Sequence, residues 1–401
     1  MKLIVQKYGG TSVGDTIKMQ NVANRIISKK EQGYDVVVVV SAMGKTTDRL
    51  VELAKSISKN PHKRDLDMLM STGEQISISL LSMLLKDKGY DCVCLTGFQA
   101  GIKTEGQHTK SKISDIEIEN IKNYLYIGQI VIVAGFQGVN ESGDITTLGR
   151  GGSDTTAVAL SAKLDCGCEI YTDVDGIYSV DPRLYSGAKK LDYISYEDMI
   201  EMASLGAGVM ETRAVEIGCK YNVEIYVASS INNSKGTYIG VFDREMEKKI
   251  VTGLSIADNR VLVRLDNILM YSKFVGEVFD KISKEYINID TITQTMPIDN
   301  RVSISFTASS EDEYMLRKVI NDVKKKYSEI EVFVEYNIVK VSIVGVGLMN
   351  QSGLIGRLFI LLSENDIRFK QITTSEKSIS YTIDSKDRDR LVEVLAHALD
   401  L

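Results

Sequence analysis

Histidine is scarce in this chain. The three histidines, His62, His108 and His397, lie far apart in the 401-residue sequence, so we do not expect a histidine-based metal centre or catalytic triad. No uninterrupted stretch of about 18 apolar residues occurs, and membrane-spanning helices need that length. The chain opens directly in an expected strand, without the basic and apolar segments of a signal peptide. These absences predict a cytoplasmic protein that does not enter a membrane.

Cysteine is also limited, to two Cys-x-Cys pairs and a single residue: Cys92, Cys94, Cys166, Cys168 and Cys219. Structural zinc sites normally leave about two to four residues between paired cysteines, so no metal site is predicted. The odd number of cysteines agrees with a reducing compartment. We expect reduced thiols with a structural role, because small thiols pack well on a buried strand face.

Positive charge is not in excess either. The net charge of −6 lacks the basic surplus that a general nucleic-acid-binding surface needs. Apolar residues make up 44% of the chain, as in soluble globular proteins. A length of 401 residues is enough for about two to four domains.

The first 245 residues alternate between expected strands and helices. Three apolar runs, at 35–41, 129–135 and 169–173, are typical of strands buried on both faces, and residues 71–86 have the apolar spacing of a helix. This alternation predicts a mostly parallel sheet covered by helices. The functional loops of such a sheet lie at the carboxyl ends of its strands.

A weak internal repeat, with an offset of about 80 residues, follows in the last part of the chain. Residues 278–282 correspond to 358–362, and residues 287–292 correspond to 367–372. Each copy is expected to run strand, helix, strand, strand, helix. Only the first copy has a further strand, at 331–335, before the next unit begins.

The second copy therefore needs a strand from elsewhere, because an unpaired sheet edge is unfavourable. Residues 250–256, just before the first copy, have a suitable length. We predict a catalytic domain at 1–245 and, after a charged linker at 243–249, two interleaved modules: residues 257–337, and residues 338–401 together with 249–256. A second module of only three strands is the alternative.

Residues 2–12 form a short expected strand that leads into Lys7, paired glycines and two hydroxyls. Glycines at the end of a strand let backbone N–H groups approach an anion, and the lysine adds a compact positive charge. This chemistry suits nucleotide phosphates, although a plain strand-to-helix turn fits the segment alone equally well. The loop at 41–47 contains Gly-Lys-Thr but is not a P-loop, because Val39 stands where that motif has its first glycine.

Two further loops carry candidate binding chemistry. In 149–156, two glycines precede Ser-Asp-Thr-Thr and an alanine-rich helix. Arg150 is suited to bidentate pairing with a carboxylate, and the helix start favours a second anion; an ordinary cap at Asp154 is the alternative. Residues 171–183 follow another strand and suit ribose, base and phosphate contacts, or else form a turn capped by aspartates.

Taken together, these motifs resemble those of aspartate kinases, which belong to the amino acid kinase fold. They occur in the order found in that family, at Lys7–Ser12, Ser41–Gly44, Ser71–Glu74, Gly149–Asp154 and Thr172–Arg183. The C-terminal repeat resembles the paired ACT modules of the same enzymes. The likeness covers nearly the whole chain.

The resemblance implies an α/β amino-acid kinase fold, a mostly parallel sheet sandwiched by helices, followed by two βαββαβ ACT modules. It implies phosphorylation of the side-chain carboxylate of L-aspartate, with ATP and Mg²⁺, to give 4-phospho-L-aspartate. This reaction begins the synthesis of lysine, threonine and methionine. The acceptor is already ionised at pH 7, so no catalytic histidine or cysteine is required.

By motif match, the resemblance assigns roles to individual residues. Lys7 and Asp154 would be catalytic, with Lys7 stabilising the transferring phosphoryl group and Asp154 organising Lys7 and the magnesium–ATP. ATP would contact Lys7, Gly9, Gly10, Ser41, Thr172, Asp173, Tyr178, Asp181 and Arg183. Aspartate would contact Thr47, Glu74, Arg150, Gly151, Gly152 and Ser153, with Glu74 binding its ammonium group and Arg150 a carboxylate.

The ACT resemblance implies feedback inhibition by an amino acid, with lysine as the first choice and threonine as the second. It also implies a homodimer or homotetramer formed through these modules. The effector is expected to contact Met270, Tyr271, Ser272, Val275, Asn288 and Asp290. Asp290 suits an effector ammonium group, although an exposed aspartate at a strand end is nearly as good an interpretation.

One segment departs from the family pattern. Many members have Gly-Ala-Lys-x-x-His-Pro-Arg, whereas residues 206–213 here are Gly-Ala-Gly-Val-Met-Glu-Thr-Arg. Gly208 therefore removes one expected phosphate contact. The rival interpretations are another kinase of the same fold, acting for example on glutamate or acetylglutamate, and a non-catalytic amino-acid sensor. The paired modules count against the first rival, and intact Lys7, Arg150 and Asp154 count against the second.

Overall fold

The computed structural model describes residues 2–401 except 242–249, 271–272, 328 and 349–352. It divides into two compact units. The first unit consists of Met1–Ser179, Lys189–Ser204 and Gly208–Lys248, and the second of Val180–Ala188, Leu205–Ala207 and Lys249–Leu401. The linker expected at 243–249 lies outside the described residues.

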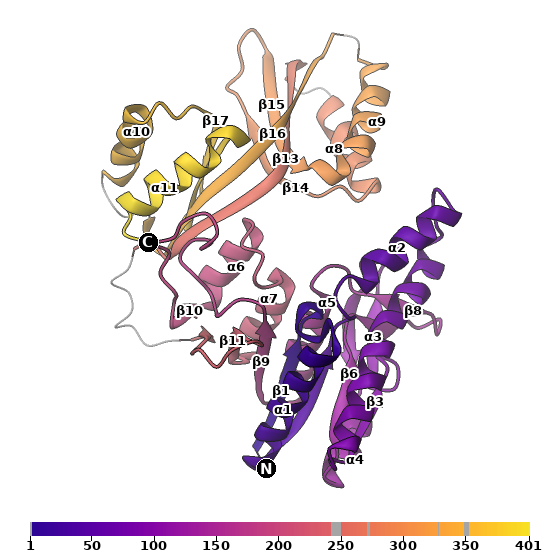
Figure 1. The fold of residues 1–401 in the computed structure, drawn as a ribbon. Coiled ribbons are helices and arrows are strands. Elements are labelled where there is room, and N and C mark those ends of the chain that lie inside the picture. Colours follow the sequence, from indigo (N-terminus) through magenta and orange to yellow (C-terminus); the bar gives the residue numbers. More distant parts are fainter. Residues whose placement is uncertain (1, 242–249, 271–272, 328, 349–352) are drawn as a thin grey trace. The chain divides into compact units, whose positions relative to one another are not determined.

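An eight-stranded sheet forms the centre of the first unit (Figure 1). Its strands are β1 (Lys2–Tyr8), β2 (Tyr34–Val40), β3 (Cys92–Leu95), β6 (Ile130–Ala134), β9 (Gly167–Thr172), β10 (Tyr193–Ser195), β11 (Ile225–Ser229) and β12 (Thr237–Gly240). Their order is β10-β12-β11-β9-β1-β2-β6-β3, and every pair is parallel except β11 with β12. The mostly parallel sheet predicted from the alternating pattern is therefore confirmed.

The first unit also contains a small second sheet. Its strands are β4 (Ile102–Glu105), β5 (Lys112–Ile116), β7 (Gln137–Val139) and β8 (Ile145–Thr147), in the order β5-β4-β7-β8. The remaining elements of the unit are η1 (Gly10–Val13), α1 (Thr16–Glu31), α2 (Thr46–Ile57), α3 (Lys63–Asp87), α4 (Glu119–Tyr126), α5 (Gly152–Leu164), α6 (Tyr196–Ser204) and α7 (Thr212–Tyr221).

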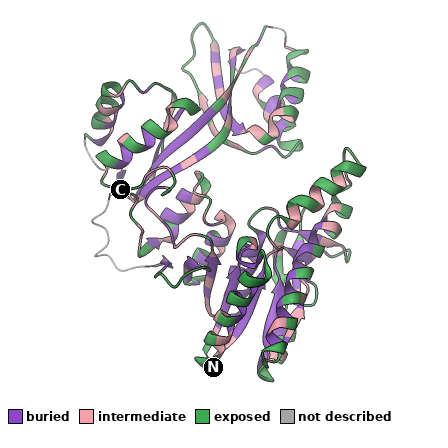
Figure 2. Ribbon diagram, in the orientation of Figure 1, coloured by how far each residue is buried: buried purple, intermediate pink, exposed green. Residues whose placement is uncertain are grey.

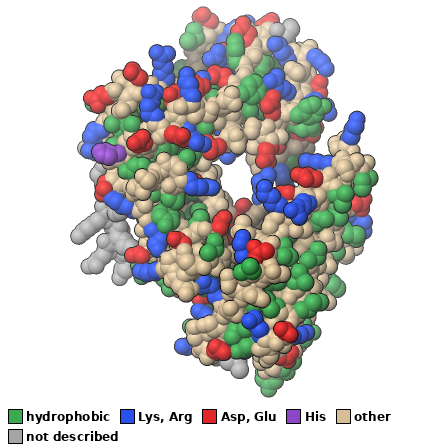
Figure 3. Space-filling view, in the orientation of Figure 1, with side chains coloured by type: hydrophobic (Ala, Val, Ile, Leu, Met, Phe, Trp, Pro, Cys, Tyr) green, Lys and Arg blue, Asp and Glu red, His purple; other side chains and the backbone are tan. Residues whose placement is uncertain are grey.

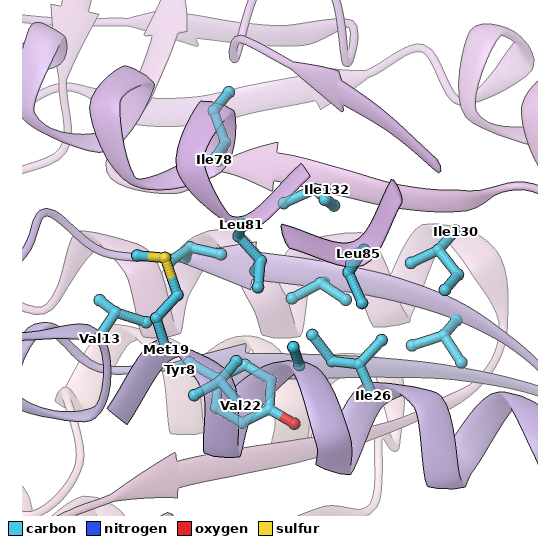
Figure 4. Close-up of a cluster of buried hydrophobic side chains, with 14 of the residues drawn as sticks. Tyr8, Val13, Met19, Val22, Ile26, Ile78, Leu81, Leu85, Ile130 and Ile132 are labelled. Carbon is cyan, nitrogen blue, oxygen red and sulfur yellow. The ribbon is translucent and has the colours of Figure 1, made fainter. Parts of the chain in front are cut away.

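Helices α1 and α3 pack on one face of the large sheet. Met19, Val22 and Ile26 of α1 and Leu81 and Leu85 of α3 are buried in one apolar cluster with alternate residues of β1, β2 and β6 (Figure 4). Helix α5 contacts β1, β2 and β9. Because successive strand side chains point to opposite faces, the residues of β1 divide between these helices.

Helix α3 begins at Lys63, eight residues before the predicted start at Ser71. The prediction was wrong because Ser71 and Thr72 look like caps, whereas their hydroxyls donate to carbonyl oxygens of the preceding helical turn. By length and composition α3 is apolar enough to cross a membrane, but half of that stretch is buried within the protein. A core helix has the same character.

The second unit contains a six-stranded antiparallel sheet with the order β14-β15-β13-β16-β18-β17. These strands are β13 (Gly253–Leu269), β14 (Ile289–Gln294), β15 (Arg301–Ser309), β16 (Glu331–Val344), β17 (Phe369–Thr374) and β18 (Ser378–Asp384). The helical elements are α8 (Phe274–Lys284), η3 (Ser310–Asp312), α9 (Glu313–Lys324), α10 (Leu354–Glu364), η5 (Ser385–Asp387) and α11 (Arg388–Ala398).

Two separate apolar cores support this sheet, one for each copy of the sequence repeat. The first gathers side chains of β13, β14, β15, α8 and α9, and the second those of β16, β18, α10 and α11. The start of β13, at 253–257, pairs with the end of β16, at 340–344. Of the residues 250–256 expected to supply a separate strand, 253–256 are the first part of the long strand β13.

The burial pattern separates core from surface within each unit. Buried residues follow the strands and the inner sides of the helices in Figure 2. The cysteines are free thiols, of which Cys92 and Cys168 are buried. On the face shown in Figure 3, side chains of both charge signs are interspersed, in keeping with a modest net charge of −6.

Candidate active site

Lys7 and Asp154 form a buried ion pair at the carboxyl end of the large sheet. Lys7 is the next-to-last residue of β1 and, like Val5, points away from the face on which Tyr8 packs. Asp154 lies in the first turn of α5. Its Oδ1 is 2.6 Å from the Lys7 Nζ, and the two side chains are only 9% and 11% exposed. A buried charge needs such a partner, so each of these two side chains stabilises the charge of the other inside the protein.

The glycine turn after β1 is packed tightly against the loop after β2. A Cβ on Gly10 would lie 2.6 Å from the carbonyl oxygen of Ala42, and the Gly44 N–H donates to the Gly10 carbonyl at 2.9 Å. The Gly9 N–H donates to the Tyr171 carbonyl at 3.2 Å. The Gly9 N–H is therefore already hydrogen-bonded to the neighbouring strand β9.

Glu74 is a buried carboxylate directly under the same loop. Its Oε1 accepts a hydrogen bond from the Ala42 N–H at 3.1 Å, and its Oε2 is buried with no hydrogen-bond partner among the described residues. Burial raises the pKa of Glu74 from 4.5 to about 7, partly opposed by backbone hydrogen bonds. Gly73 permits this approach, because a Cβ there would lie 2.9 Å from that of Ala42. The unpartnered oxygen is suited to a cationic ligand.

A hydroxyl pair connects the loop after β2 to the start of α5. The Ser41 Oγ is 2.7 Å from the Ser153 Oγ. These residues were predicted to contact ATP and aspartate respectively, so the structure brings one residue from each predicted group into contact. Thr47, also predicted to contact aspartate, lies in the first turn of α2 and is half-buried.

The turn before α5 carries the remaining residues of the predicted aspartate site. Gly151 has a left-handed φ of 64° and Gly152 begins the helix, while Arg150 is exposed. A Cβ on Gly151 would lie 2.6 Å from Oε2 of Glu211. Burial raises the pKa of Glu211, Arg213 opposes this, and the nearby Asp154 adds to it. Glu211 therefore lies at the edge of this site.

A buried aspartate on α3 supports this turn from below. Asp67 is fully buried and accepts hydrogen bonds from Thr147 Oγ1 at 2.5 Å and from the Thr109 N–H at 3.0 Å. The Nδ1 of His108 lies 2.7 Å from its Oδ2. Thr147 ends β8, just before the turn at 149–151, so the network holds the strand from which that turn begins.

Arg213 holds the other side of the turn. Its guanidinium donates to the carbonyl oxygen of Leu148 and, at 3.2 Å, to that of Ser111. A rigid guanidinium fork suits two carbonyl acceptors at fixed positions. The turn at 149–151 thus lies between two polar supports, the buried Asp67 and the half-buried Arg213, neither of which was predicted to have a role.

The residues predicted to contact ATP from the loop after β9 divide between the two units. Thr172 donates from its hydroxyl to Asp173 at 3.0 Å, and Tyr178 forms a β-bridge with Lys190, all within the first unit. Asp181 and Arg183 belong to the second unit and pair with each other, with Arg183 Nη2 at 2.6 Å from Asp181 Oδ2. The hydrogen bond from Arg183 holds the pKa of Asp181 below its usual range.

Of the residues predicted for the effector, Tyr271 and Ser272 lie outside the described residues. Met270 precedes α8 and Val275 lies in its first turn, while Asn288 directly precedes β14 and Asp290 belongs to it. Asp290 has cationic neighbours already, because its Oδ2 is 3.7 Å from Arg260 and 3.9 Å from Lys340. Its Oδ1 accepts from the Thr307 hydroxyl.

Sequence reasoning missed three supporting residues of this site: Asp67, His108 and Arg213. Their partners lie 41 to 102 residues away along the chain, so no local pattern reveals them. A partial signal exists for Asp67, because it is an acidic residue on the buried side of α3, and buried charges of this kind need a fixed partner.

Comparison with known proteins identifies relatives of the whole chain. Residues 2–229 match the amino acid kinase family, and residues 341–399 match the ACT domain. The chain is 46% identical to aspartokinase 2 of Bacillus subtilis over 402 aligned positions, covering all of this chain and 98% of that protein. It is also 46% identical to the aspartokinase of Geobacillus stearothermophilus, with the same coverage.

Solved structures agree with these relatives. The fold is similar to that of Escherichia coli aspartokinase III in complex with aspartate and ADP, with a TM-score of 0.82, 23% identity and complete coverage of both chains. The aspartate kinase of Synechocystis is 37% identical, with a TM-score of 0.55, over all of this chain and 69% of that one.

Proposed function

We propose that L-aspartate and ATP meet at Lys7, Glu74 and Asp154. The chain belongs to the aspartokinases of the amino acid kinase family, and the proposal proceeds from that membership. An aspartokinase is a kinase that transfers the γ-phosphoryl group of ATP to the side-chain carboxylate of L-aspartate, giving 4-phospho-L-aspartate and ADP. The observation that carries the proposal is the buried Lys7–Asp154 pair at the start of α5.

The acceptor is a competent nucleophile without a general base. An aspartate side chain, with an ordinary pKa of about 3.9, is ionised at pH 7. One of its oxygens attacks the γ-phosphorus while the bond from that phosphorus to the β–γ bridging oxygen breaks, and ADP leaves with the electron pair. Catalysis then depends on alignment and on neutralising charge. In our proposal Lys7 supplies the positive charge and Asp154 holds its Nζ in position.

Glu74 is the proposed partner of the aspartate ammonium group. Its Oε2 is buried without a hydrogen-bond partner among the described residues, so an ammonium donor would satisfy it. Arg150 is proposed to bind a carboxylate of the same substrate, since a guanidinium pairs with both oxygens. Thr47, Gly151, Gly152 and Ser153 would complete the aspartate pocket.

The nucleotide is proposed to contact the glycine turn and the loop after β9. Gly10 offers backbone at the end of β1, and Ser41 lies beside Ser153. The proposed ATP contacts are Lys7, Gly9, Gly10, Ser41, Thr172, Asp173, Tyr178, Asp181 and Arg183. Because the Gly9 N–H is bonded to Tyr171, Gly9 would contribute by leaving space beside the Lys7 Nζ. That Nζ would lie 3.5 Å from a Cβ on Gly9.

Mg²⁺ is proposed to arrive with the nucleotide. Among the residues that the structure describes, no group of three or more His, Cys, Asp or Glu side chains is placed to hold a metal. Mg²⁺ is usually bound through one or two carboxylates together with substrate phosphates. Asp154 is the carboxylate we assign to it. The ion would neutralise charge on the phosphate oxygens.

The second unit is proposed to regulate the enzyme by binding lysine, with threonine as the second choice, and to form a homodimer or homotetramer. The E. coli aspartokinase III of the same fold forms a complex with lysine and aspartate.

We also propose the module boundaries 257–337 and 338–401 plus 249–256, a cytoplasmic location, and a role at the start of lysine, threonine and methionine synthesis.

A product assay tests the proposed reaction. Acyl phosphates react with hydroxylamine to give coloured hydroxamates, so the full chain with ATP, Mg²⁺ and aspartate should yield both ADP and a hydroxamate. Lys7→Ala should lower kcat by about 10²–10³, as loss of a preorganised electrostatic contact does. Lys122→Ala, on the exposed side of α4, is the matched control and should be unaffected.

Folding must be monitored, because Lys7→Ala leaves Asp154 buried without its partner. The double variant Lys7→Ala/Asp154→Ala removes both charges and should also be inactive while giving a normal circular dichroism spectrum. Near-normal turnover in either variant would contradict the assignment. Turnover with glutamate in place of aspartate would show a different kinase, and no turnover in the wild type would favour an amino-acid sensor.

A further inference from the structure

A cavity of about 650 Å³ lies within the second unit, where its two halves meet. Residues 258–261 of β13 and 336–339 of β16 line it, together with Ser310 before α9 and Ser385 before α11. It shares no residue with the candidate active site, and it borders the residues predicted to bind the effector, because Arg260 Nη1 lies 3.7 Å from Asp290 Oδ2. Nothing in the proposed function uses it.

Matching irregularities in the two central strands create this cavity. Asn259 on β13 and Asn337 on β16 both have a left-handed φ of 55°. The β13–β16 register shifts between Ala257 and Arg260, and again between Arg260 and Leu262. Such bulges bend a strand and re-aim its side chains. Each irregular stretch lines the cavity together with the turn that precedes a helix, so the two halves contribute equivalent elements.

The lining is positively charged overall. Three arginines, Arg260, Arg317 and Arg388, face it, against two carboxylates, Asp258 and Glu313. Both carboxylates are already paired. Arg388 Nη1 lies 3.2 Å from Asp258 Oδ2, and Arg317 Nε lies 3.1 Å from Glu313 Oε1. The starts of α9 and α11 add the positive ends of two helix dipoles.

Two polar atoms in the lining are buried and have no hydrogen-bond partner among the described residues: Nε of Arg260 and the hydroxyl of Tyr336. A guanidinium nitrogen can only donate. A buried donor without an acceptor costs about 1–3 kcal/mol. The Arg260 guanidinium is paired through its Nη1, which lies 3.7 Å from Asp290 Oδ2, so only its Nε lacks an acceptor. The two carboxylates of the lining are paired with other arginines.

We propose that this cavity binds a small organic anion bearing a phosphate or carboxylate group, which accepts hydrogen bonds from Arg260 and Tyr336. The ligand would bridge the two halves of the unit, because Arg260 comes from β13 while Tyr336 comes from β16. The paired carboxylates disfavour a simple cation as the occupant.

Isothermal titration calorimetry on the full chain tests this site. Inorganic phosphate and succinate serve as probes at constant ionic strength, with saturating ADP and aspartate present so that the kinase pocket is filled. We expect saturable binding of one probe per chain. Preference for phosphate or for succinate identifies the group that the site accepts.

Variants locate the binding. Arg260→Gln should weaken it about 10- to 100-fold, as expected for a lost hydrogen bond to a charged group. Tyr336→Phe removes only the unpartnered hydroxyl, so it should fold at least as stably as the wild type and still weaken binding several-fold. Arg357→Gln, an exposed arginine on α10, is the matched control and should bind like the wild type.

Two results would overturn the proposal. One is the absence of saturable binding of either probe in the wild type at millimolar concentrations. The other is binding of equal strength in the wild type, Arg260→Gln and Tyr336→Phe, which would place the anion elsewhere. Since Tyr336→Phe perturbs no ion pair, a folding defect in Arg260→Gln does not remove the test.

Discussion

Replacing Glu74 by glutamine separates a functional charge from its effect on stability. Burial raises the pKa of Glu74 from 4.5 to about 7, whereas the unfolded chain keeps the ordinary value. The folded protein therefore holds this proton more tightly than the unfolded chain does. Its contribution to stability is fully present below pH 4.5, is lost as the pH rises, and is absent above about pH 7.

The magnitude follows from that interval. At 1.36 kcal/mol per pH unit, the range from 4.5 to about 7 corresponds to about 3 kcal/mol of destabilisation at pH 8. Glutamine has no charge to desolvate, but its amide group would leave one polar atom buried without a partner, which costs about 1–3 kcal/mol at any pH. The difference in free energy of unfolding between Glu74→Gln and the wild type should therefore shift by about 2–3 kcal/mol in favour of the variant when the pH is raised from 5 to 8.

Urea unfolding followed by circular dichroism at pH 8 and pH 5 measures this difference. Glu52→Gln, which lies exposed on α2, is the matched control and should show no such dependence on pH. A stability difference between Glu74→Gln and the wild type that does not change with pH would refute the reasoning, because it would mean that the buried carboxylate carries no desolvation penalty.

The same variant tests the proposed ammonium contact. At pH 8 the KM for aspartate should rise about 10- to 100-fold, since a hydrogen bond between two charged groups is lost. In the wild type the KM should rise about tenfold for each pH unit below 7, as Glu74 takes up its proton. The variant should lack that dependence, and an unchanged KM would show that another residue binds the ammonium group.

Three further substitutions probe the glycine turn, its support and regulation. Gly10→Ala should reduce kcat and lower stability by about 1–3 kcal/mol, because its Cβ would lie 2.6 Å from the Ala42 carbonyl; wild-type kinetics would show that the turn can shift. Asp67→Asn should raise the KM for aspartate and lower the urea midpoint, because one of its acceptor oxygens becomes a donor; a change in stability alone would limit Asp67 to a structural role. Asp290→Ala should relieve inhibition by lysine with little change in the uninhibited rate, and retained inhibition would place the effector elsewhere.

Local sequence patterns were sufficient for the large, mostly parallel sheet of the first unit, but not for the small second sheet β5-β4-β7-β8. The five-valine run of β2 is buried on both faces, and a strand of that composition is stable only inside a sheet covered on both sides. The positions of the loops at the carboxyl ends of the strands follow from the alternation of strands and helices. These features depend on periodicity, which is encoded in neighbouring residues.

The contacts that form the site depended on the tertiary structure. The true start of α3 at Lys63 places Glu74 in the middle of a helix, and the Tyr171 carbonyl takes the Gly9 N–H. Asp67 and Arg213 support the turn before α5 through partners distant in sequence. Such pairings are decided by which strands and helices pack together, and no local pattern specifies that.

The second unit shows the same division. The sequence by itself predicted two copies of a module and a shortage of one strand. Only the tertiary structure shows that β13 and β16 each run unbroken through both copies, with left-handed asparagines where they cross from one to the other. The physical reason is that strand pairing satisfies backbone N–H and C=O groups without regard to side-chain identity, so the chain's composition does not reveal where a strand ends.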